Sequence, residues 1–277
     1  MVDSRLDKMA ASWAKKVQKA ASQKITSRTF TAFNTNVDVV VHITNENLNS
    51  IMEKNTNIVA DNLAQDFTRQ ADLINTPEAF LSTLLGAMQE GKSLYAITSS
   101  DEFLGWLEES FPEANEILGG QAGIVANQLS SLDAQAAVYS RLLSPKQAAL
   151  FRDEVLSPKI EDNRLKLDSV KKVARQEDQC KINWIFEYAK DLTIKLGDIT
   201  VTTPTANRVI LVTRPENAIM SFPDEIMPYL PELGKQFDLA FMAGYHYISE
   251  MNPDGRSYEE YLEKSIEEIR LLRKENE

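Results

Sequence analysis

The chain has 277 residues, of which 43% are hydrophobic and 26% are charged, so its composition is that of a globular protein. Its 41 acidic and 30 basic side chains give a formal net charge of −11. This excess of negative charge argues against a nucleic acid as partner, because phosphate backbones are bound by clustered Lys and Arg. Cys180 is the only cysteine, so no disulfide forms within the chain and no Cys-rich metal site can be built.

The N-terminal residues 1–20 lack the apolar stretch of a signal peptide and instead have the pattern of an amphipathic helix. No run of 18 or more apolar residues occurs in the sequence, so we expect no membrane span and no membrane partner. Together with the single cysteine, these features indicate a cytoplasmic protein.

A β-branched and aromatic run at residues 29–43 predicts one buried strand. Within it Asn34, Asn36 and Asp38 recur at every second position, which puts three polar side chains on one face. Amide and carboxylate groups that converge in this way suit a polyhydroxylated ligand, because each forms directional hydrogen bonds with hydroxyls. The alternative is structural: the same side chains would cap the strand or bond to neighbouring backbone.

Residues 46–115 are helical in pattern, with capping signals at Thr76-Pro77-Glu78 and at Ser99–Glu102. A glycine pair, Gly119-Gly120, then precedes small and apolar residues at helical spacing, so a helix is predicted to begin near Gln121. Backbone N–H groups and the Gln121 amide at such a helix start would bind ligand oxygens. The structural alternative is a tight turn with no ligand.

Short apolar runs continue through the second half of the sequence. Residues 136–143 predict a strand, and Ser144-Pro145 predicts the start of a short helix. A meander of antiparallel strands is predicted at residues 182–188, 192–201 and 208–213. A strand at 237–245 and a charged helix at 257–276 follow. Strands that alternate with helices predict an α/β layer with a parallel sheet, into which the middle strands are inserted.

Five segments of the sequence form a pattern in their order and spacing. They are Asn34-x-Asn36-x-Asp38, Gly119-Gly120-Gln121, INWIFEY at residues 182–188, Ala206-Asn207-Arg208 and AFMAGYHYI at residues 240–248. Together they resemble the ADP-dependent sugar kinases, which comprise phosphofructokinases and glucokinases. The resemblance implies a ribokinase-like α/β fold, in which a large domain with a central, mostly parallel sheet and helices on both faces carries a smaller α/β lid. The expected division assigns residues 1–45, 116–155 and 218–277 to the large domain and residues 46–115 and 156–217 to the lid.

The resemblance also implies roles for single residues. Asn36 and Asp38, with Asn34 beside them, would bind sugar hydroxyls, and Arg208 would contact a sugar phosphate. The sugar-binding glycine turn would comprise Gly119, Gly120 and Gln121. Tyr95 stands where glucokinases of the family have a glutamate. Fructose 6-phosphate is therefore the expected sugar, and glucose is the alternative.

The implied activity is that of an ADP-dependent 6-phosphofructokinase of glycolysis, which converts ADP and fructose 6-phosphate to AMP and fructose 1,6-bisphosphate with Mg²⁺. An ADP-dependent glucokinase and a non-catalytic sugar-binding remnant are the alternatives.

One motif of the family is missing from the sequence. The Gly-x-Gly-Asp motif that supplies the general base in these kinases does not occur, so no catalytic residue is expected within the chain and the general base is expected beyond Glu277. We therefore expect a truncated chain that lacks about the last third to half of such a kinase, including most of the ADP and Mg²⁺ sites. Such a chain would show no turnover and would self-associate through an exposed sheet edge.

Overall fold

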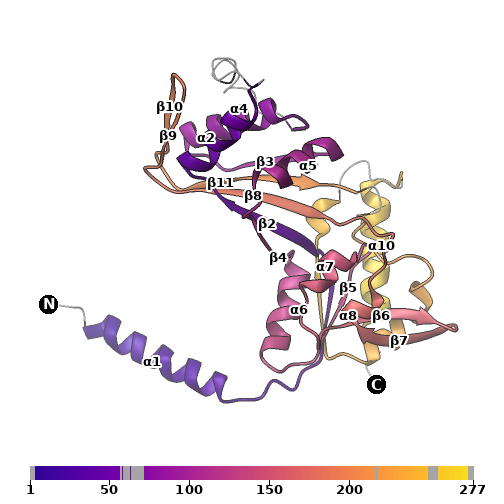
Figure 1. Cartoon of the computed structure of the whole chain (residues 1–277). Coiled ribbons are helices and arrows are strands. Elements are labelled where there is room, and N and C mark those ends of the chain that lie inside the picture. Colours follow the sequence, from indigo (N-terminus) through magenta and orange to yellow (C-terminus); the bar gives the residue numbers. More distant parts are fainter. Residues whose placement is uncertain are drawn as a thin grey trace.

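The computed structural model describes residues 4–56, 58, 63, 72–215, 218–248 and 255–273, which form two five-stranded sheets, a two-stranded ribbon and the helices around them (Figure 1). The first sheet has the order β12-β1-β5-β6-β7. Its strands are β12 (Leu239–Ala243), β1 (Thr29–Phe33), β5 (Ala136–Tyr139), β6 (Leu156–Glu161) and β7 (Arg164–Ser169). The first four run parallel and β7 is antiparallel to β6, so the predicted mostly parallel sheet is confirmed.

Helices cover both faces of the first sheet, because the side chains of its strands alternate between two cores. In β5, Ala136 and Val138 belong to one core, whereas Ala137 and Tyr139 belong to the other. The first core is closed by α6 (Gln121–Ser131), α7 (Pro145–Ala149) and α8 (Val170–Val173). The second core is closed by the 3₁₀ turn η1 (Met227–Tyr229), α9 (Leu230–Lys235) and α10 (Tyr258–Leu272). This arrangement confirms the α/β class.

The second sheet has the order β3-β11-β8-β2-β4 and is covered by helices on one face (Figure 1). Its strands are β3 (Leu94–Thr98), β11 (Asn207–Thr213), β8 (Ile182–Tyr188), β2 (Asn36–His42) and β4 (Asn115–Gly119). The covering helices are α2 (Asn45–Lys54), α4 (Pro77–Glu90) and α5 (Asp101–Ser110). Trp184, Phe186 and Tyr188 of β8 are buried against this layer, and the residues between them are more exposed. The second sheet therefore has one packed face and one open face.

The open face carries apolar side chains at its centre and polar ones around them. Ile97, Ile185 and Ile210 come from neighbouring strands and are each partly exposed. Register pairs Asp38 with Asn183 on the same face, near the end where the chain enters β2. A ligand on this face would therefore contact apolar side chains at the centre and polar side chains near the end where the chain enters β2.

The remaining elements lie outside the two sheets. The hairpin of β9 (Thr193–Leu196) and β10 (Ile199–Thr202) packs near α2 and α4, and the 3₁₀ turn η2 (Tyr245–Tyr247) follows β12. The N-terminal helix α1 (Ser4–Ala21) stands apart from the rest of the chain (Figure 1). None of the helices in the described part of the chain combines the length and the apolar character needed to cross a membrane.

The predicted helix starts are confirmed by their capping hydrogen bonds. Thr76, Ser100 and Ser144 each accept a backbone N–H at the start of α4, α5 and α7, and proline follows two of them. Ser257 and Glu260 form a capping box at the start of α10. These starts were predictable because the capping residue and its partner are three residues apart.

The single strand predicted at residues 29–43 is wrong, because the chain changes sheets within it. β1 ends at Phe33 and pairs in the first sheet, and β2 begins at Asn36 and pairs in the second. Asn34 N donates to Ala243 O of the first sheet at 3.1 Å, whereas Val37 N donates to Lys181 O at 2.9 Å. Because both strands are buried apolar runs, their hydrophobicity does not show that the chain leaves the first sheet after β1 and enters the second at β2.

Other expectations failed where pairing depends on residues distant in sequence. The region 46–115, expected to be helical, also contains β3 and the first residue of β4. The run at 192–201 is two strands that turn at Gly197, where φ is +57°. The predicted meander is also wrong in its order, because β8 and β11 pair directly as antiparallel neighbours and the segment between them forms a separate two-stranded ribbon.

The sheets also depart from the expected division of the chain. β2 and β4 pair in the second sheet, although residues 1–45 and 116–155 were expected in the large domain. β6 and β7 pair in the first sheet, although residues 156–217 were expected in the lid. Strand patterns predict that a segment is a strand but not which sheet it joins.

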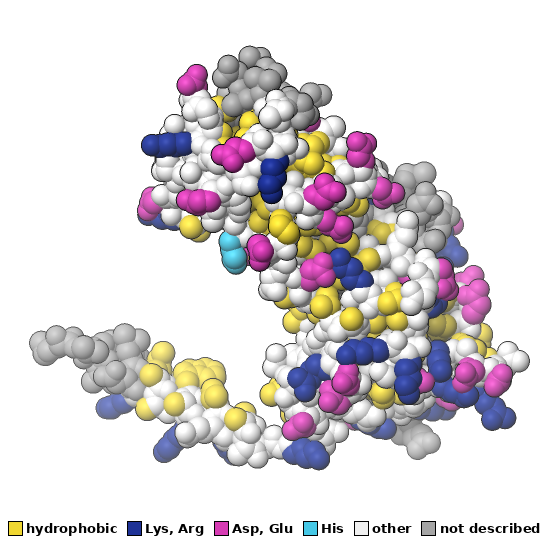
Figure 2. Space-filling model, in the orientation of Figure 1, with side chains coloured by type: hydrophobic (Ala, Val, Ile, Leu, Met, Phe, Trp, Pro, Cys, Tyr) yellow, Lys and Arg dark blue, Asp and Glu magenta, His cyan; other side chains and the backbone are white. Residues whose placement is uncertain are grey.

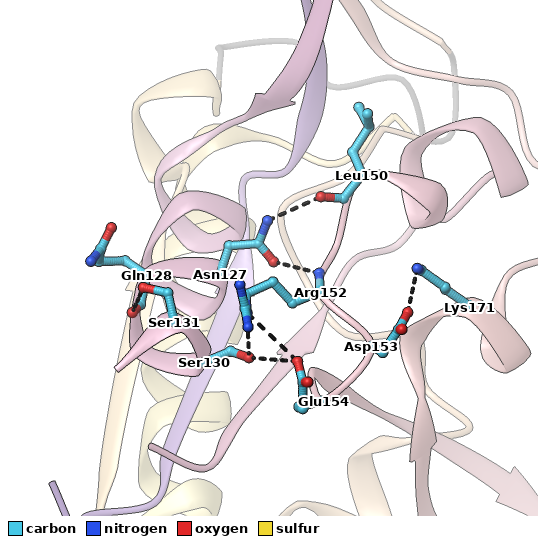
Figure 3. Close-up of polar contacts among 9 residues, drawn as sticks. All are labelled: Asn127, Gln128, Ser130, Ser131, Leu150, Arg152, Asp153, Glu154 and Lys171. Atoms are coloured by element: carbon cyan, nitrogen blue, oxygen red, sulfur yellow. Dashed lines mark hydrogen bonds and ion pairs between the residues drawn. The ribbon is translucent and has the colours of Figure 1, made fainter. Parts of the chain in front are cut away.

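Polar contacts hold the C-terminal half of α6 on the segment that follows α7 (Figure 3). Asn127 Nδ2 donates to Leu150 O, and Arg152 N donates to Asn127 Oδ1, both at 3.0 Å. Arg152 Nε donates to Ser130 Oγ at 3.3 Å and lies 3.6 Å from Glu154 Oε2. These contacts fix the position of α6, whose N-terminus lies where the chain passes from the second sheet to the first.

Tyr188→Phe tests a bond that holds β3 in the second sheet. The buried Tyr188 hydroxyl lies 3.0 Å from Ala87 O and 2.6 Å from Lys92 O, at the end of α4 and just before β3. Ala87 O still accepts from Lys92 N, but the change removes a buried hydrogen bond and the hydroxyl that lies against Lys92 O. We therefore expect the free energy of unfolding to fall by about 1–3 kcal/mol in urea denaturation. Tyr258→Phe, at an exposed tyrosine, is the control and should change it by less than about 0.5 kcal/mol. Equal effects of the two changes would contradict the prediction.

Candidate functional site

The candidate site lies where the chain passes between the two sheets. We call the residues gathered there the junction cluster: Asn34, Asn36, Asp38, Gly119, Gly120, Gln121, Lys181 and Asn183. They come from the start of β2, the turn between β4 and α6, and the start of β8. Six of them were predicted from the sequence, and Lys181 and Asn183 were not.

The Asp38 carboxylate is held by two amides. Asn36 Nδ2 and Asn183 Nδ2 donate to Asp38 Oδ1 at 2.5 Å and 2.9 Å. Burial raises the pKa of Asp38, while these two hydrogen bonds and the positive charges of Lys181 and Arg208 act against the rise. Asn183 Oδ1 is buried and has no hydrogen-bond partner among the described residues. The cluster therefore offers acceptor oxygens of the kind that bind a sugar hydroxyl.

Asn34 does not share the strand face of Asn36 and Asp38, because it lies before β2 in the crossing segment. Its side chain nevertheless joins the cluster. Asn34 Nδ2 donates to Gln121 Oε1 at 3.3 Å, and Lys181 Nζ donates to Asn34 Oδ1 at 3.0 Å. Asn34 therefore reaches the site as predicted, but for a different reason. It lies in the segment that crosses between the sheets, and not on the same strand face as Asn36 and Asp38.

The glycine pair permits the close approach of the segments. A Cβ on Gly119 would lie 2.2 Å from Asn36 Nδ2 and 2.3 Å from Asp38 Cγ. Gly120 has φ +78°, and a Cβ there would lie 2.4 Å from Asn34 O. Both residues must therefore be glycine for the cluster to form. One backbone donor at the start of α6 is already used, since Ala122 N donates to Asn34 O at 3.0 Å.

Two cations at the site were not predicted from the sequence: Lys181, which belongs to the junction cluster, and Arg214 near it. Lys181 is only 7% exposed, and its pKa is lowered to about 8. Burial is the main cause, the charge of Arg214 also lowers the pKa, and the charge of Asp38 partly opposes the shift. Lys181 directly precedes β8 and Arg214 directly follows β11. These two strand ends are joined by Ile182 N, which donates to Thr213 Oγ1 at 2.8 Å. A single Lys before a strand and a single Arg after another strand form no recognisable sequence motif. The two residues come close together only because β8 and β11 pair.

Tyr95 lies beside Arg214 on the open face of the second sheet. Arg214 Nη2 is 3.5 Å from Tyr95 Oη, and the guanidinium carbon is 5.9 Å from the ring centre. Both side chains are exposed. The tyrosine therefore supports the guanidinium through a cation–π contact.

Arg208 lies at the other end of β11 from Arg214, and its side chain is exposed. It shares the open face with Asp38, and its charge helps to lower the pKa of that carboxyl. Together with Tyr95, Glu187 and Asn207 it lines a groove of about 670 Å³. The structure thus puts Arg208 along the open face and not beside Lys181.

The general base and the main Mg²⁺ ligands were expected beyond Glu277. Glu277 itself lies outside the described residues, so both expectations remain predictions. Among the residues that the structure describes, no group of three or more His, Cys, Asp or Glu could hold a metal ion.

Comparison with known proteins agrees with the resemblance read from the sequence. The family model for the ADP-specific phosphofructokinase/glucokinase conserved region matches residues 27–277. An ADP-specific phosphofructokinase of Thermococcus litoralis is 34% identical over 252 residues, which are 90% of this chain and 54% of that protein. An ADP-dependent glucose/glucosamine kinase of Pyrococcus abyssi is 23% identical over 244 residues. The chain spans about half the length of the curated relatives it matches.

Solved structures agree with the fold. A hypothetical ADP-dependent phosphofructokinase of Pyrococcus horikoshii superposes with a TM-score of 0.77 at 30% identity, over 90% of this chain and 55% of that one. An ADP-dependent kinase in complex with fructose 6-phosphate and ADPβS superposes with a TM-score of 0.72 at 28% identity, over 94% of this chain and 52% of that one. The predicted ribokinase-like α/β fold is thereby confirmed. With the family model matched over all but the first 26 residues, the chain belongs to the ADP-specific phosphofructokinase/glucokinase family.

Proposed function

We propose that this chain carries the sugar-phosphate site of an ADP-dependent 6-phosphofructokinase. The observation that carries the proposal is the hydrogen bond from Lys181 to Asn34 within the junction cluster, together with the paired strand ends that bring Arg214 near Lys181. Two cations suit the phosphate of fructose 6-phosphate, and the carboxylate and amides suit its hydroxyls. The names of the relatives that are 31–34% identical favour the same substrate.

In the proposed reaction, the oxygen of the sugar 1-hydroxyl forms a bond to the β-phosphorus of ADP. The bond from that phosphorus to the bridging oxygen breaks, and AMP leaves. The hydroxyl proton passes to a general base, which is expected in the Gly-x-Gly-Asp motif that this sequence lacks. The assignment of ADP as the phosphoryl donor rests only on membership of the family. The roles proposed for the residues described here are therefore binding and orientation of the sugar phosphate.

The second sheet is proposed as the lid. Its open face carries Tyr95 and Arg208, and its end at the junction carries Asp38. If the chain bends at the crossings Asn34-Thr35 and Gly119-Gly120, this face approaches the first sheet and encloses a sugar. A non-catalytic sugar-binding protein remains the second candidate, because the sequence contains the sugar-site motifs without the motif of the general base.

Titration calorimetry with fructose 6-phosphate tests the site directly. We expect the chain to bind this sugar phosphate, and Asp38→Ala to weaken binding at least about tenfold, which is the scale of a lost hydrogen bond to a charged group. A coupled assay should detect no ADP-dependent turnover by residues 1–277. Asp198→Ala, on the β9–β10 turn, is the control and should leave binding unchanged. Equal binding by the Asp38 variant would remove Asp38 from the site, and robust turnover would mean that the catalytic residues lie within this chain.

The pH dependence of binding tests Lys181. Because its pKa is about 8, Lys181 carries its full charge below that pH and loses it as the pH rises through 8. We expect the affinity for fructose 6-phosphate to fall between about pH 7 and about pH 9, a range in which the sugar phosphate itself stays a dianion. Lys181→Arg keeps the charge in this range and should remove the decline, whereas Lys181→Met should weaken binding at every pH. A decline that persists in the arginine variant would assign the titration to another group.

Tyr95→Glu tests sugar selectivity. A glutamate at this position would pair with Arg214 and draw it away from a phosphate, while offering a carboxylate to a glucose hydroxyl. We expect the ratio of affinities for fructose 6-phosphate and glucose to fall at least about tenfold relative to the unmodified chain. Tyr95→Phe retains the ring beneath Arg214 and should leave the ratio within about threefold. A ratio that favours glucose in the unmodified chain would show that Tyr95 does not select against it.

A further inference from the structure

A series of buried hydrogen bonds holds Thr35, in the segment that crosses between the sheets. The series joins Thr35 to Ser140, directly after β5, and to Gln147 of α7, and the three residues are 2%, 7% and 0% exposed. Gln147 Nε2 donates to Thr35 Oγ1 at 2.5 Å, and Thr35 Oγ1 donates to Ser140 Oγ at 2.7 Å. Ser140 Oγ donates in turn to Leu142 O at 2.6 Å. Because each hydroxyl accepts one bond and donates one, the series runs in one direction, from the Gln147 amide to the Leu142 carbonyl.

The helix that carries Gln147 lies where the two sheets meet. Figure 1 shows α7 at this place, close to β2, and Figure 2 shows that the molecular surface continues there from one sheet to the other. The N-cap Ser144 accepts a bond from Gln147 N at 3.3 Å, which fixes the backbone of Gln147. On the same helix, Lys146 Nζ lies 2.6 Å from Glu116 Oε1 of β4. α7 therefore packs in a core of the first sheet and also contacts the second sheet.

Stability alone does not explain a glutamine at position 147. Gln147 Oε1 is buried and has no hydrogen-bond partner among the described residues. A buried polar atom without a partner destabilises a fold, whereas an apolar side chain of similar size would leave no such atom. Residues that break a packing rule in this way are expected at functional positions. The reason for the amide is therefore to be sought in the residue that its donor holds.

That residue, Thr35, stands between two members of the junction cluster. Asn34 and Asn36 flank it, and the side chains of both make hydrogen bonds within the cluster. The Thr35 side chain instead bonds outside the cluster, to the end of β5 and to α7. Rotation of the backbone at Thr35 would move both asparagines relative to Asp38. A bond that fixes Thr35 therefore fixes the orientation of both amides.

We propose that Gln147 is a positioning residue of the sugar-phosphate site. It acts through Thr35, whose position sets how the Asn34 and Asn36 amides face the ligand, and it does not itself touch the ligand. The inference rests on the proposed function, because the ligand that the amides are held for is the sugar phosphate. The control of the two amides by Gln147 is a separate statement, which can be tested without any ligand.

Gln147→Leu tests the positioning role, because it removes the donor and the unpaired oxygen together at similar volume. We expect its melting temperature to stay within about 2 °C of that of the unmodified chain, since the two losses offset each other. Its affinity for fructose 6-phosphate in titration calorimetry should fall at least about fivefold. In ¹H–¹⁵N correlation spectra without ligand, the side-chain amide signals of Asn34 and Asn36 should shift. A merely structural role would not lower the affinity at unchanged stability.

Thr35→Val breaks the same bond from its other partner and serves if the leucine variant does not fold. Its affinity should fall by a similar factor, and the double variant should bind no more than about twofold more weakly than Thr35→Val alone, because both changes break one bond. Thr203→Val is the matched control. Thr203 is also buried, and its hydroxyl donates to Ala189 O at 2.6 Å beside the β9–β10 hairpin. This change should lower the melting temperature and leave the affinity and the signals of Asn34 and Asn36 unchanged.

The outcomes distinguish this inference from the proposed function. Binding of fructose 6-phosphate that neither Gln147→Leu nor Thr35→Val weakens would overturn the positioning role and leave the sugar-phosphate site in place. Amide signals that stay unshifted in Gln147→Leu, or losses of affinity that add up in the double variant, would also overturn it. An unmodified chain that does not bind fructose 6-phosphate would contradict the proposed function, whereas shifted amide signals in Gln147→Leu would still support the control of the two amides by Gln147.

Discussion

The contact between two glycines and the crossing segment is the constraint on which the site depends. With no Cβ at Gly119 or Gly120, β4 and the start of α6 pass directly against Asn34, Asn36 and Asp38. The partly buried Asp38 carboxylate thereby lies beside β4, and the Asn34 carbonyl reaches the first turn of α6. A Cβ at Gly119 would displace the side chains of Asn36 and Asp38, and a Cβ at Gly120 would collide with the Asn34 carbonyl of the crossing segment.

The same closeness sets the electrostatics of the junction. Lys181 is desolvated, and its charge is tolerated because Asp38 and the Asn34 amide face it. Arg214 raises the local positive charge from the neighbouring strand end. The positive charges of Lys181 and Arg214 are the physical basis of the proposal that a phosphorylated ligand binds at the junction.

Local chemistry made part of this structure predictable from the sequence. Capping residues indicated where α4, α5, α7 and α10 begin. The glycine pair indicated where α6 begins. The candidate residues Asn36, Asp38 and Gly119 were found because their spacing is set within one strand or turn. These features depend on residues close together in the chain.

What the sequence did not reveal depends on long-range pairing. No feature of the neighbouring sequence shows that β1 and β2 belong to different sheets. Nor does it show that β3 pairs with a strand more than a hundred residues away. Lys181 and Arg214 meet because β8 and β11 are antiparallel neighbours whose ends coincide. Asn183 faces Asp38 because β2 and β8 are in register. Each of these contacts follows from topology, which periodicity does not specify.

The isoleucines on the open face of the second sheet have a thermal consequence. Ile97, Ile185 and Ile210 are partly exposed, and whatever covers this face removes them from water. Burial of apolar surface lowers the heat capacity, and the favourable free energy it provides weakens on cooling. The polar contacts at the junction do not share this dependence. In the proposed closure of the second sheet, covering of the open face is therefore the contribution that weakens on cooling.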